Sequence, residues 1–172
     1  MKKINAFISK QAITSNSQEA FALNSKSSFG EKINDKIKFS LSEAFFLVEE
    51  GKMKIFFKNK ELSKKEIEKK LQNIDKRFHL KYTIFKDLRK KGYIVKTALK
   101  FGADFRVYDK GKKPKQAHAK WIVFVSHESE KLSWQDFSAK NRVAHSTKKS
   151  LLLAIIDEEE DILYYEVKWI KP

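Results

Sequence analysis

The pattern of hydrophobic and polar residues predicts two capped helices in the first half of the chain. Ser40 and Glu43 have the spacing of a capping box just before an apolar run. Ser63 and Glu66 repeat that spacing before a second stripe of isoleucine and leucine. Residues 13–30 are polar and rich in serine and asparagine, a composition typical of turns. We therefore expect short strands and loops that lead into the two capped helices.

The second half predicts helices that alternate with strands. Residues 79–92 have the apolar spacing of a helix that ends at a glycine, and a further helix is expected from Ser133 to about Ala144. Apolar runs rich in β-branched and aromatic residues predict strands at 93–101, 105–111, 121–126, 151–157 and 162–170. The last two runs flank the acidic turn 158–161, which predicts a terminal hairpin. Near-continuous apolar strands are typical of the centre of a sheet.

A change of pattern near residues 75–80 predicts two domains. Residues 1–77 are expected to form a small α+β domain, and residues 78–172 an α/β domain with a mixed central sheet. The chain has 172 residues, of which 41% are hydrophobic, and it contains fourteen phenylalanines. This apolar content is sufficient for packed cores, so the sequence predicts a globular chain of the α+β or α/β class.

The charge balance predicts a polyanionic partner. Lysine and arginine together number 37 against 22 acidic residues, which gives a formal net charge of +15. Nucleic acid is the first candidate, because neutralising its phosphates releases counterions and supplies affinity. Lysine outnumbers arginine 33 to 4, so a lysine-rich proteome is a second explanation for the charge.

The absence of cysteine excludes a disulfide framework, a thiolate nucleophile and a zinc knuckle. The N-terminal residues 1–11 lack the apolar run of a signal peptide, and no stretch approaches the roughly 18 apolar residues of a membrane span. We therefore expect a cytoplasmic protein without a membrane partner.

Tyr108 and His118 stand on either side of a basic loop. The stretch "YDKGKKPKQAHAKW", residues 108–121, holds four lysines between them. Histidine is suited to proton transfer, because imidazole gains and loses a proton near neutral pH. Nearby cations favour the negatively charged form of a phenol, which makes Tyr108 a candidate base. The pair is a candidate acid–base site beside a phosphate, with a merely solvated loop as the alternative.

Several motifs in order along the chain resemble the archaeal tRNA intron endonuclease family. They are "ADFRVYDKG" at 103–111, "HAKWIVFV" at 118–125, "RVAHSTKKSLLLAIID" at 142–157 and "YYEVKWIKP" at 164–172. The resemblance extends upstream through "DLRKKGYIVKTALKFG" and so covers essentially all of residues 78–172. "LSEAFFLVEEGKM" resembles the N-terminal domain of the family more loosely. The resemblance implies a restriction-endonuclease-like fold for the catalytic domain.

The resemblance also implies a catalytic triad. Its members are Tyr108 as general base, His118 as general acid and Lys149 as electrostatic stabiliser, with Lys148 as a one-residue alternative for the lysine. The family cleaves precursor tRNA at both intron–exon junctions of a bulge-helix-bulge. Cleavage uses attack by the 2′-hydroxyl, leaves 2′,3′-cyclic phosphate and 5′-hydroxyl ends, and needs no metal or other cofactor.

Arg142 resembles one of two cationic residues that sandwich a base of the RNA bulge in relatives. At the place of the second cation the chain offers Tyr164, Lys168 or Trp169. The full triad and the acidic loop 157–161 in one short chain resemble the homotetrameric type, a dimer of dimers. In that type the acidic loop contacts a basic cleft of a neighbouring subunit, and the C-terminal strand contributes to dimerisation. The loop carboxylates expected at that contact are Asp157, Glu158, Glu159 and Asp161.

Two other functions remain open from the sequence. A subunit that only positions RNA would share the fold without cutting, although such relatives tend to lose triad residues. A metal-dependent nuclease would combine Glu166 of the "EVK" pattern with Asp136, Asp157 or Asp161. Three-residue patterns are weak signals, and Glu166 lies in an alternating strand where a solvent-facing position is expected.

Overall fold

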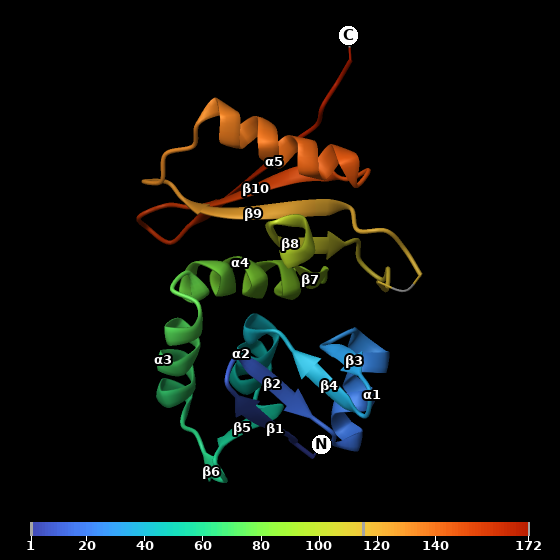
Figure 1. Cartoon of the computed structure of the whole chain (residues 1–172), viewed down its shortest axis with the longest axis vertical. Coiled ribbons are helices and arrows are strands. Elements are labelled where there is room, and N and C mark those ends of the chain that lie inside the picture. Colours follow the sequence, from blue (N-terminus) through green and yellow to red (C-terminus); the bar gives the residue numbers. More distant parts are fainter. Residues whose placement is uncertain (1, 115, 172) are drawn as a thin grey trace. The chain divides into compact units, whose positions relative to one another are not determined.

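The structure is a computed structural model that describes residues 2–114 and 116–171. The chain divides into two compact units, Met1–His79 and Leu80–Pro172, and helix α4 (Phe78–Lys90) runs across the division. Each unit contains one sheet with both parallel and antiparallel strands (Figure 1). The predicted mixed α+β class is therefore confirmed.

The N-terminal unit is built on a six-stranded sheet in the order β3-β4-β2-β1-β5-β6. Its strands are β1 (Ile4–Ser9), β2 (Ala12–Ser15), β3 (Glu31–Ile33), β4 (Lys36–Phe39), β5 (Met53–Phe57) and β6 (Lys60–Glu61). Strands β1 and β5 pair in parallel, whereas the other neighbours are antiparallel. In β1 every second residue is buried, as expected for a strand with one face on the core.

The two predicted capping boxes are confirmed. Helix α2 (Leu41–Glu49) begins after Ser40, and helix α3 (Lys64–Ile74) begins after Ser63. In each helix the serine hydroxyl accepts a hydrogen bond from the backbone N–H of the glutamate three residues later, whose carboxylate accepts from the serine N–H. These bonds satisfy amide groups that have no partner within the helix.

Helix α1 (Gln18–Ser27) shows that the expectation of turns throughout residues 13–30 is wrong. Ser17 begins this helix by accepting a hydrogen bond from the Ala20 N–H. Ala20 is the only buried residue of the helix, so its sequence lacks a strong apolar stripe. Serine and asparagine favour both helix caps and turns, and here the capping role prevails.

The C-terminal unit contains a five-stranded sheet in the order β11-β10-β9-β8-β7. Its strands are β7 (Ile94–Ala98), β8 (Ala103–Tyr108), β9 (Trp121–His127), β10 (Ser150–Ile156) and β11 (Ile162–Val167). Only β9 and β10 pair in parallel, and β10 and β11 form the predicted hairpin. Residues 99–101, expected at the end of a strand, form a short 3₁₀ turn instead.

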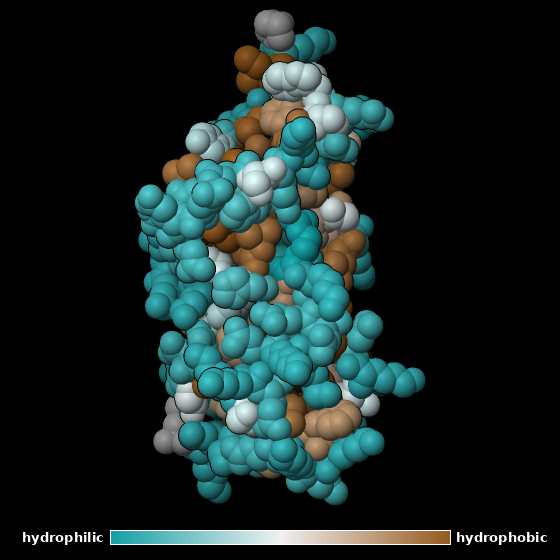
Figure 2. Space-filling view, turned by 90° about the vertical axis from the view of Figure 1, so that its left-hand side faces the viewer, coloured by the Kyte–Doolittle hydropathy of each residue, from teal (hydrophilic) through white to brown (hydrophobic). Residues whose placement is uncertain are grey.

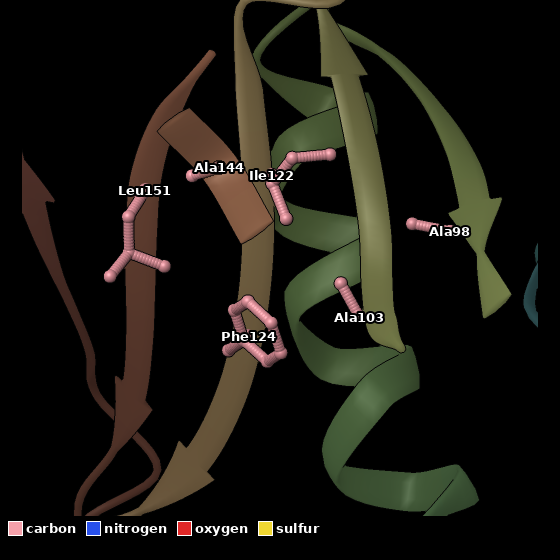
Figure 3. Packing of buried hydrophobic residues seen from close by; sticks show 6 residues of the cluster. All are labelled: Ala98, Ala103, Ile122, Phe124, Ala144 and Leu151. Atoms are coloured by element: carbon pink, nitrogen blue, oxygen red, sulfur yellow. The ribbon is translucent and has the colours of Figure 1, made fainter. Parts of the chain in front are cut away.

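Helices α4 and α5 (Trp134–Ser146) lie on opposite faces of this sheet (Figure 1). On the α4 face, the ring of Phe85 lies 6.0 Å from that of Phe105. On the α5 face, Ala144 packs with Ile122 and Leu151 in a buried cluster (Figure 3). Both faces of the central strands are therefore covered, which explains their near-continuous apolar sequences.

Candidate active site

Three segments that are distant in the sequence meet at one edge of the C-terminal sheet. The end of β8, the start of β9 and the start of β10 lie side by side there. The Lys120 N–H donates to the Val107 carbonyl at 2.7 Å, and the Ser150 N–H donates to the Lys120 carbonyl at 3.2 Å. These segments carry Tyr108, His118 and Lys149, so the fold brings the predicted triad positions to the same edge.

Tyr108 and His118 occupy different environments at this edge. Tyr108 is the last residue of β8, pairs with Ile94 and is only 4% exposed. His118 is exposed and lies in the loop just before β9. An exposed imidazole can reach a large substrate directly, whereas access to the buried phenol is restricted.

The basic loop between them is only partly described, because Lys115 lies outside the described residues. The Lys110 ammonium lies 5.3 Å from the centre of the Tyr93 ring. Lys112 is exposed, and Lys113 is partly buried. The predicted influence of these lysines on the Tyr108 phenol remains a prediction.

Lys149 lies between the end of α5 and the start of β10. Its ammonium donates to the Thr147 carbonyl at 2.6 Å and lies 5.9 Å from the centre of the Phe101 ring. Burial, followed by the positive charge of Arg106, lowers the pKa of the Lys149 ammonium below its ordinary value. The alternative, Lys148, is exposed in the preceding turn with a left-handed φ of 56°. These positions favour Lys149 as the lysine of the site.

Arg106 is a residue that the sequence interpretation missed. It lies two positions before Tyr108 in β8, and alternation along a strand places both side chains on the same face. The signal available in the sequence was this two-residue spacing within "FRVY". The proximity of Arg106 to Lys149, however, depends on how β8, β9 and β10 pair.

The residues predicted to bind an RNA base do not all lie on the same face of the sheet. Arg142 is exposed on α5, and His145 of the same helix contacts Trp169, with 4.7 Å between ring centres. Lys168 is exposed and forms an ion pair with Glu166 at 3.7 Å. Tyr164 instead bonds to Asp87 of α4, so it is directed to the other face of the sheet. The structure therefore brings Trp169, and not Tyr164, to the helix that carries Arg142.

The acidic loop lies at the opposite end of the β10–β11 hairpin from Lys149. The Asp157 carboxylate accepts hydrogen bonds from the N–H groups of Glu159 and Asp161 at 3.0 and 2.8 Å. Asp157 therefore stabilises the loop conformation itself. The side chains of Glu158, Glu159 and Asp161 are exposed.

The alternative metal site is not brought together by this hairpin. Glu166 pairs with Leu152, whereas Asp157 follows the far end of β10. At about 3.3 Å per strand residue, the two carboxylates are separated by roughly 15 Å. Within residues 2–114 and 116–171, no three His, Asp or Glu side chains are grouped in a way that could hold a metal ion.

Comparison with known proteins identifies two matching families of domains. Residues 78–164 match the tRNA intron endonuclease, catalytic C-terminal domain, and residues 5–67 match the tRNA intron endonuclease, N-terminal domain. These matches agree with the resemblance noted in the sequence motifs.

Relatives that match most of the chain are found in archaea. A tRNA-splicing endonuclease of Pyrococcus abyssi is 43% identical over 173 residues, covering 99% of each chain. One of Nanoarchaeum equitans is 43% identical over 84% of this chain and 97% of its own length. One of Methanothermobacter thermautotrophicus is 42% identical over 87% of each chain. With both domain matches and these identities, the chain belongs to the tRNA intron endonuclease family.

Proposed function

We propose that this protein is a tRNA-splicing endonuclease that cuts precursor tRNA at both intron–exon junctions of a bulge-helix-bulge. Family membership and the names of its relatives support this function. The observation that carries the site assignment is the meeting of the Tyr108, His118 and Lys149 segments at one sheet edge.

In the proposed reaction, Tyr108 accepts the proton of the ribose 2′-hydroxyl at the junction. The 2′-oxygen bonds to the adjacent phosphorus, and the bond from phosphorus to the leaving 5′-oxygen breaks. His118 donates a proton to that 5′-oxygen, and the Lys149 ammonium stabilises the negative phosphorane between the two steps. The products carry 2′,3′-cyclic phosphate and 5′-hydroxyl ends, and no metal takes part.

The exposed surface near α5 is proposed to hold the RNA. Arg142 and the His145–Trp169 pair present a cation and an aromatic ring to solvent. Such groups stack on unpaired bases, and stacking on an aromatic ring contributes about 1 to 3 kcal/mol per base. Lys168 adds positive charge beside Trp169 and would contact a phosphate.

We also propose a cytoplasmic homotetramer, a dimer of dimers. The exposed loop carboxylates would contact the basic surface of a neighbouring subunit, since the chain carries a net charge of +15. Strand β11 is the outermost strand of the sheet in the described part of the chain and exposes Leu163 and Tyr165, which suits it for dimerisation. Figure 2 shows that one face of the molecule exposes some apolar residues among mostly hydrophilic ones. In the described part of the chain, no helix has both the length and the apolarity needed to cross a bilayer.

The proposal is tested by cleavage of an end-labelled bulge-helix-bulge RNA in excess EDTA. The wild type should release two defined fragments with cyclic phosphate ends, and His118→Ala should cut at least ~10²-fold more slowly. His127→Ala is the matched control, because His127 lies at the opposite end of β9. RNA binding without cleavage by the wild type would indicate a positioning subunit. Cleavage only after magnesium is added would contradict the metal-independent reaction.

A further inference from the structure

A row of paired residues crosses the sheet and places Arg106 beside the proposed catalytic edge. Arg106 pairs with Ile122, and Ile122 pairs with Leu151. Side chains of directly paired residues lie on the same face of a sheet. Ile122 and Leu151 pack with Ala144 of α5 (Figure 3), so Arg106 lies on the α5 face.

Tyr108 and Lys149 both lie between this row of paired residues and the strand ends where the segments of the proposed triad meet. Tyr108 lies two positions beyond Arg106 along β8, and Lys149 lies two positions before Leu151. Strand alternation directs the Tyr108 side chain to the face that Arg106 occupies. The Lys149 ammonium lies 5.9 Å from the centre of the Phe101 ring, and Phe101 packs against the buried cluster on that same face. Arg106 is also close enough to Lys149 for its charge to oppose protonation of the lysine.

A second lysine adds to the positive charge. Lys96 of β7 pairs directly with Arg106, so the two cations stand side by side on this face. Lys96 is only 6% exposed, and Arg106 is partly buried. Low solvent access weakens the screening of these charges. Lys96, Arg106 and Lys149 therefore concentrate positive charge on this face, which favours a bound anion.

We propose that Arg106 binds the phosphate at the cleavage point together with Lys149. This inference rests on the proposed function. The phosphorane carries one more negative charge than the phosphodiester from which it forms. Two cations held in place therefore stabilise the transition state more than the bound substrate, which accelerates cleavage. The planar guanidinium can donate two parallel hydrogen bonds to the phosphate oxygens.

The first test compares Arg106→Gln and Arg106→Lys with the wild type in single-turnover cleavage. Arg106→Gln should lower the cleavage rate about 10²-fold. Arg106→Lys should recover part of the rate, because it keeps the charge and loses the paired donors. Affinity is measured with an RNA that has 2′-deoxyribose at both junctions and cannot be cut. Its dissociation constant should change less than about threefold, since most phosphate contacts remain. Arg77→Gln, which removes an exposed arginine of the N-terminal unit, is the control for net charge.

The second test does not depend on cleavage. Inorganic phosphate should raise the Tm of the wild type and of Arg77→Gln more than that of Arg106→Gln, compared with chloride at equal ionic strength. If the wild type fails to cut the RNA, the proposed function fails, and this measurement still decides whether Arg106 binds an anion. Normal cleavage by Arg106→Gln would overturn the inference. Equal losses of cleavage and of affinity in both Arg106 variants would also overturn it, because a purely structural role predicts that result.

Discussion

The Tyr164 hydroxyl donates a hydrogen bond to the Asp87 carboxylate, with 2.6 Å between Oη and Oδ2, although the two residues lie 77 positions apart. The Lys91 ammonium lies 2.7 Å from the same carboxylate oxygen and 5.0 Å from the centre of the Tyr164 ring. This group of side chains joins α4 to the terminal strand β11. It therefore contributes to holding in place the hairpin that begins beside Lys149.

Replacing Tyr164 by phenylalanine should destabilise the protein by about 1 to 2 kcal/mol, because a hydrogen bond to a charged acceptor is lost. Tyr165→Phe is the matched control, since Tyr165 is 52% exposed, and it should change stability by less than about 0.5 kcal/mol. Thermal or urea unfolding at neutral pH measures both. Equal effects of the two substitutions would contradict a role for this bond.

The hydrogen bond between Tyr164 and Asp87 predicts that the stability of the fold decreases at alkaline pH. Burial, then the hydrogen bond to Asp87 and its negative charge, raise the pKa of Tyr164 above the ordinary value of 10.0. The folded state therefore keeps a proton that the unfolded state loses above about pH 10, so stability falls as the pH rises past that value. Tyr164→Phe should lose less stability than the wild type between pH 9 and 11. Parallel losses in urea unfolding would contradict this assignment.

The two capping boxes should differ in importance. Glu43 is only 4% exposed, and its carboxylate accepts hydrogen bonds from the Gly30 and Ser40 N–H groups, each at 3.0 Å. Glu43→Ala would leave buried donors without this acceptor and should cost about 2 to 4 kcal/mol. Glu66→Ala removes the equivalent residue of the exposed α3 box and should cost clearly less. Urea unfolding of both variants tests the ranking, and a larger effect at Glu66 would contradict it.

Lys149 should control the alkaline limb of the cleavage profile. Lys149→Ala should slow cleavage about 10²-fold or more and leave binding of uncut RNA nearly unchanged. Burial, then the positive charge of Arg106, lower the pKa of Lys149. As the pH rises, the wild type should therefore lose this stabilising charge before the pH reaches the ordinary lysine value of 10.5. Lys149→Arg keeps its charge and should move that limb to higher pH if cleavage is retained. Other titratable or charged groups on this face include Lys96, Arg106 and Tyr108, with His118 in the adjacent loop and Lys140, Arg142 and His145 on α5. In Arg106→Gln, the alkaline limb of the cleavage profile should also move to higher pH, because the charge that lowers the Lys149 pKa is removed. This shift would assign the limb to Lys149 and not to the other groups.

The acidic loop should control assembly. The double variant Glu158→Gln/Glu159→Gln keeps Asp157, which holds the loop conformation, and removes two exposed charges. The dissociation constant of the assembly should rise roughly tenfold in this variant. High salt should also raise the dissociation constant of the wild-type assembly. Glu31→Gln/Asp35→Asn makes the same change in net charge on exposed residues of the N-terminal unit. Analytical ultracentrifugation measures the assembly of the wild type and of both double variants. Equal effects of the two double variants would argue against a contact at the loop.

The sequence by itself determined the features that depend on neighbouring residues. The boxes at Ser40 and Ser63 were predictable because a capping box involves groups only three positions apart. The terminal hairpin followed from two apolar runs around an acidic turn. The α1 helix was missed because its serines and asparagines favour turns as well as caps, and little apolar periodicity distinguishes the two.

Tertiary structure alone decided which side chains face one another across the sheet. The motifs predicted a site of Tyr108, His118 and Lys149, but only the pairing of β8, β9 and β10 places their segments at one edge. The same pairing sets Arg106 beside Lys149, and packing of α4 directs Tyr164 away from the helix that bears Arg142. A shift of one residue in strand register would move each of these side chains to the other face. That register is set by long-range packing, which local sequence patterns do not contain.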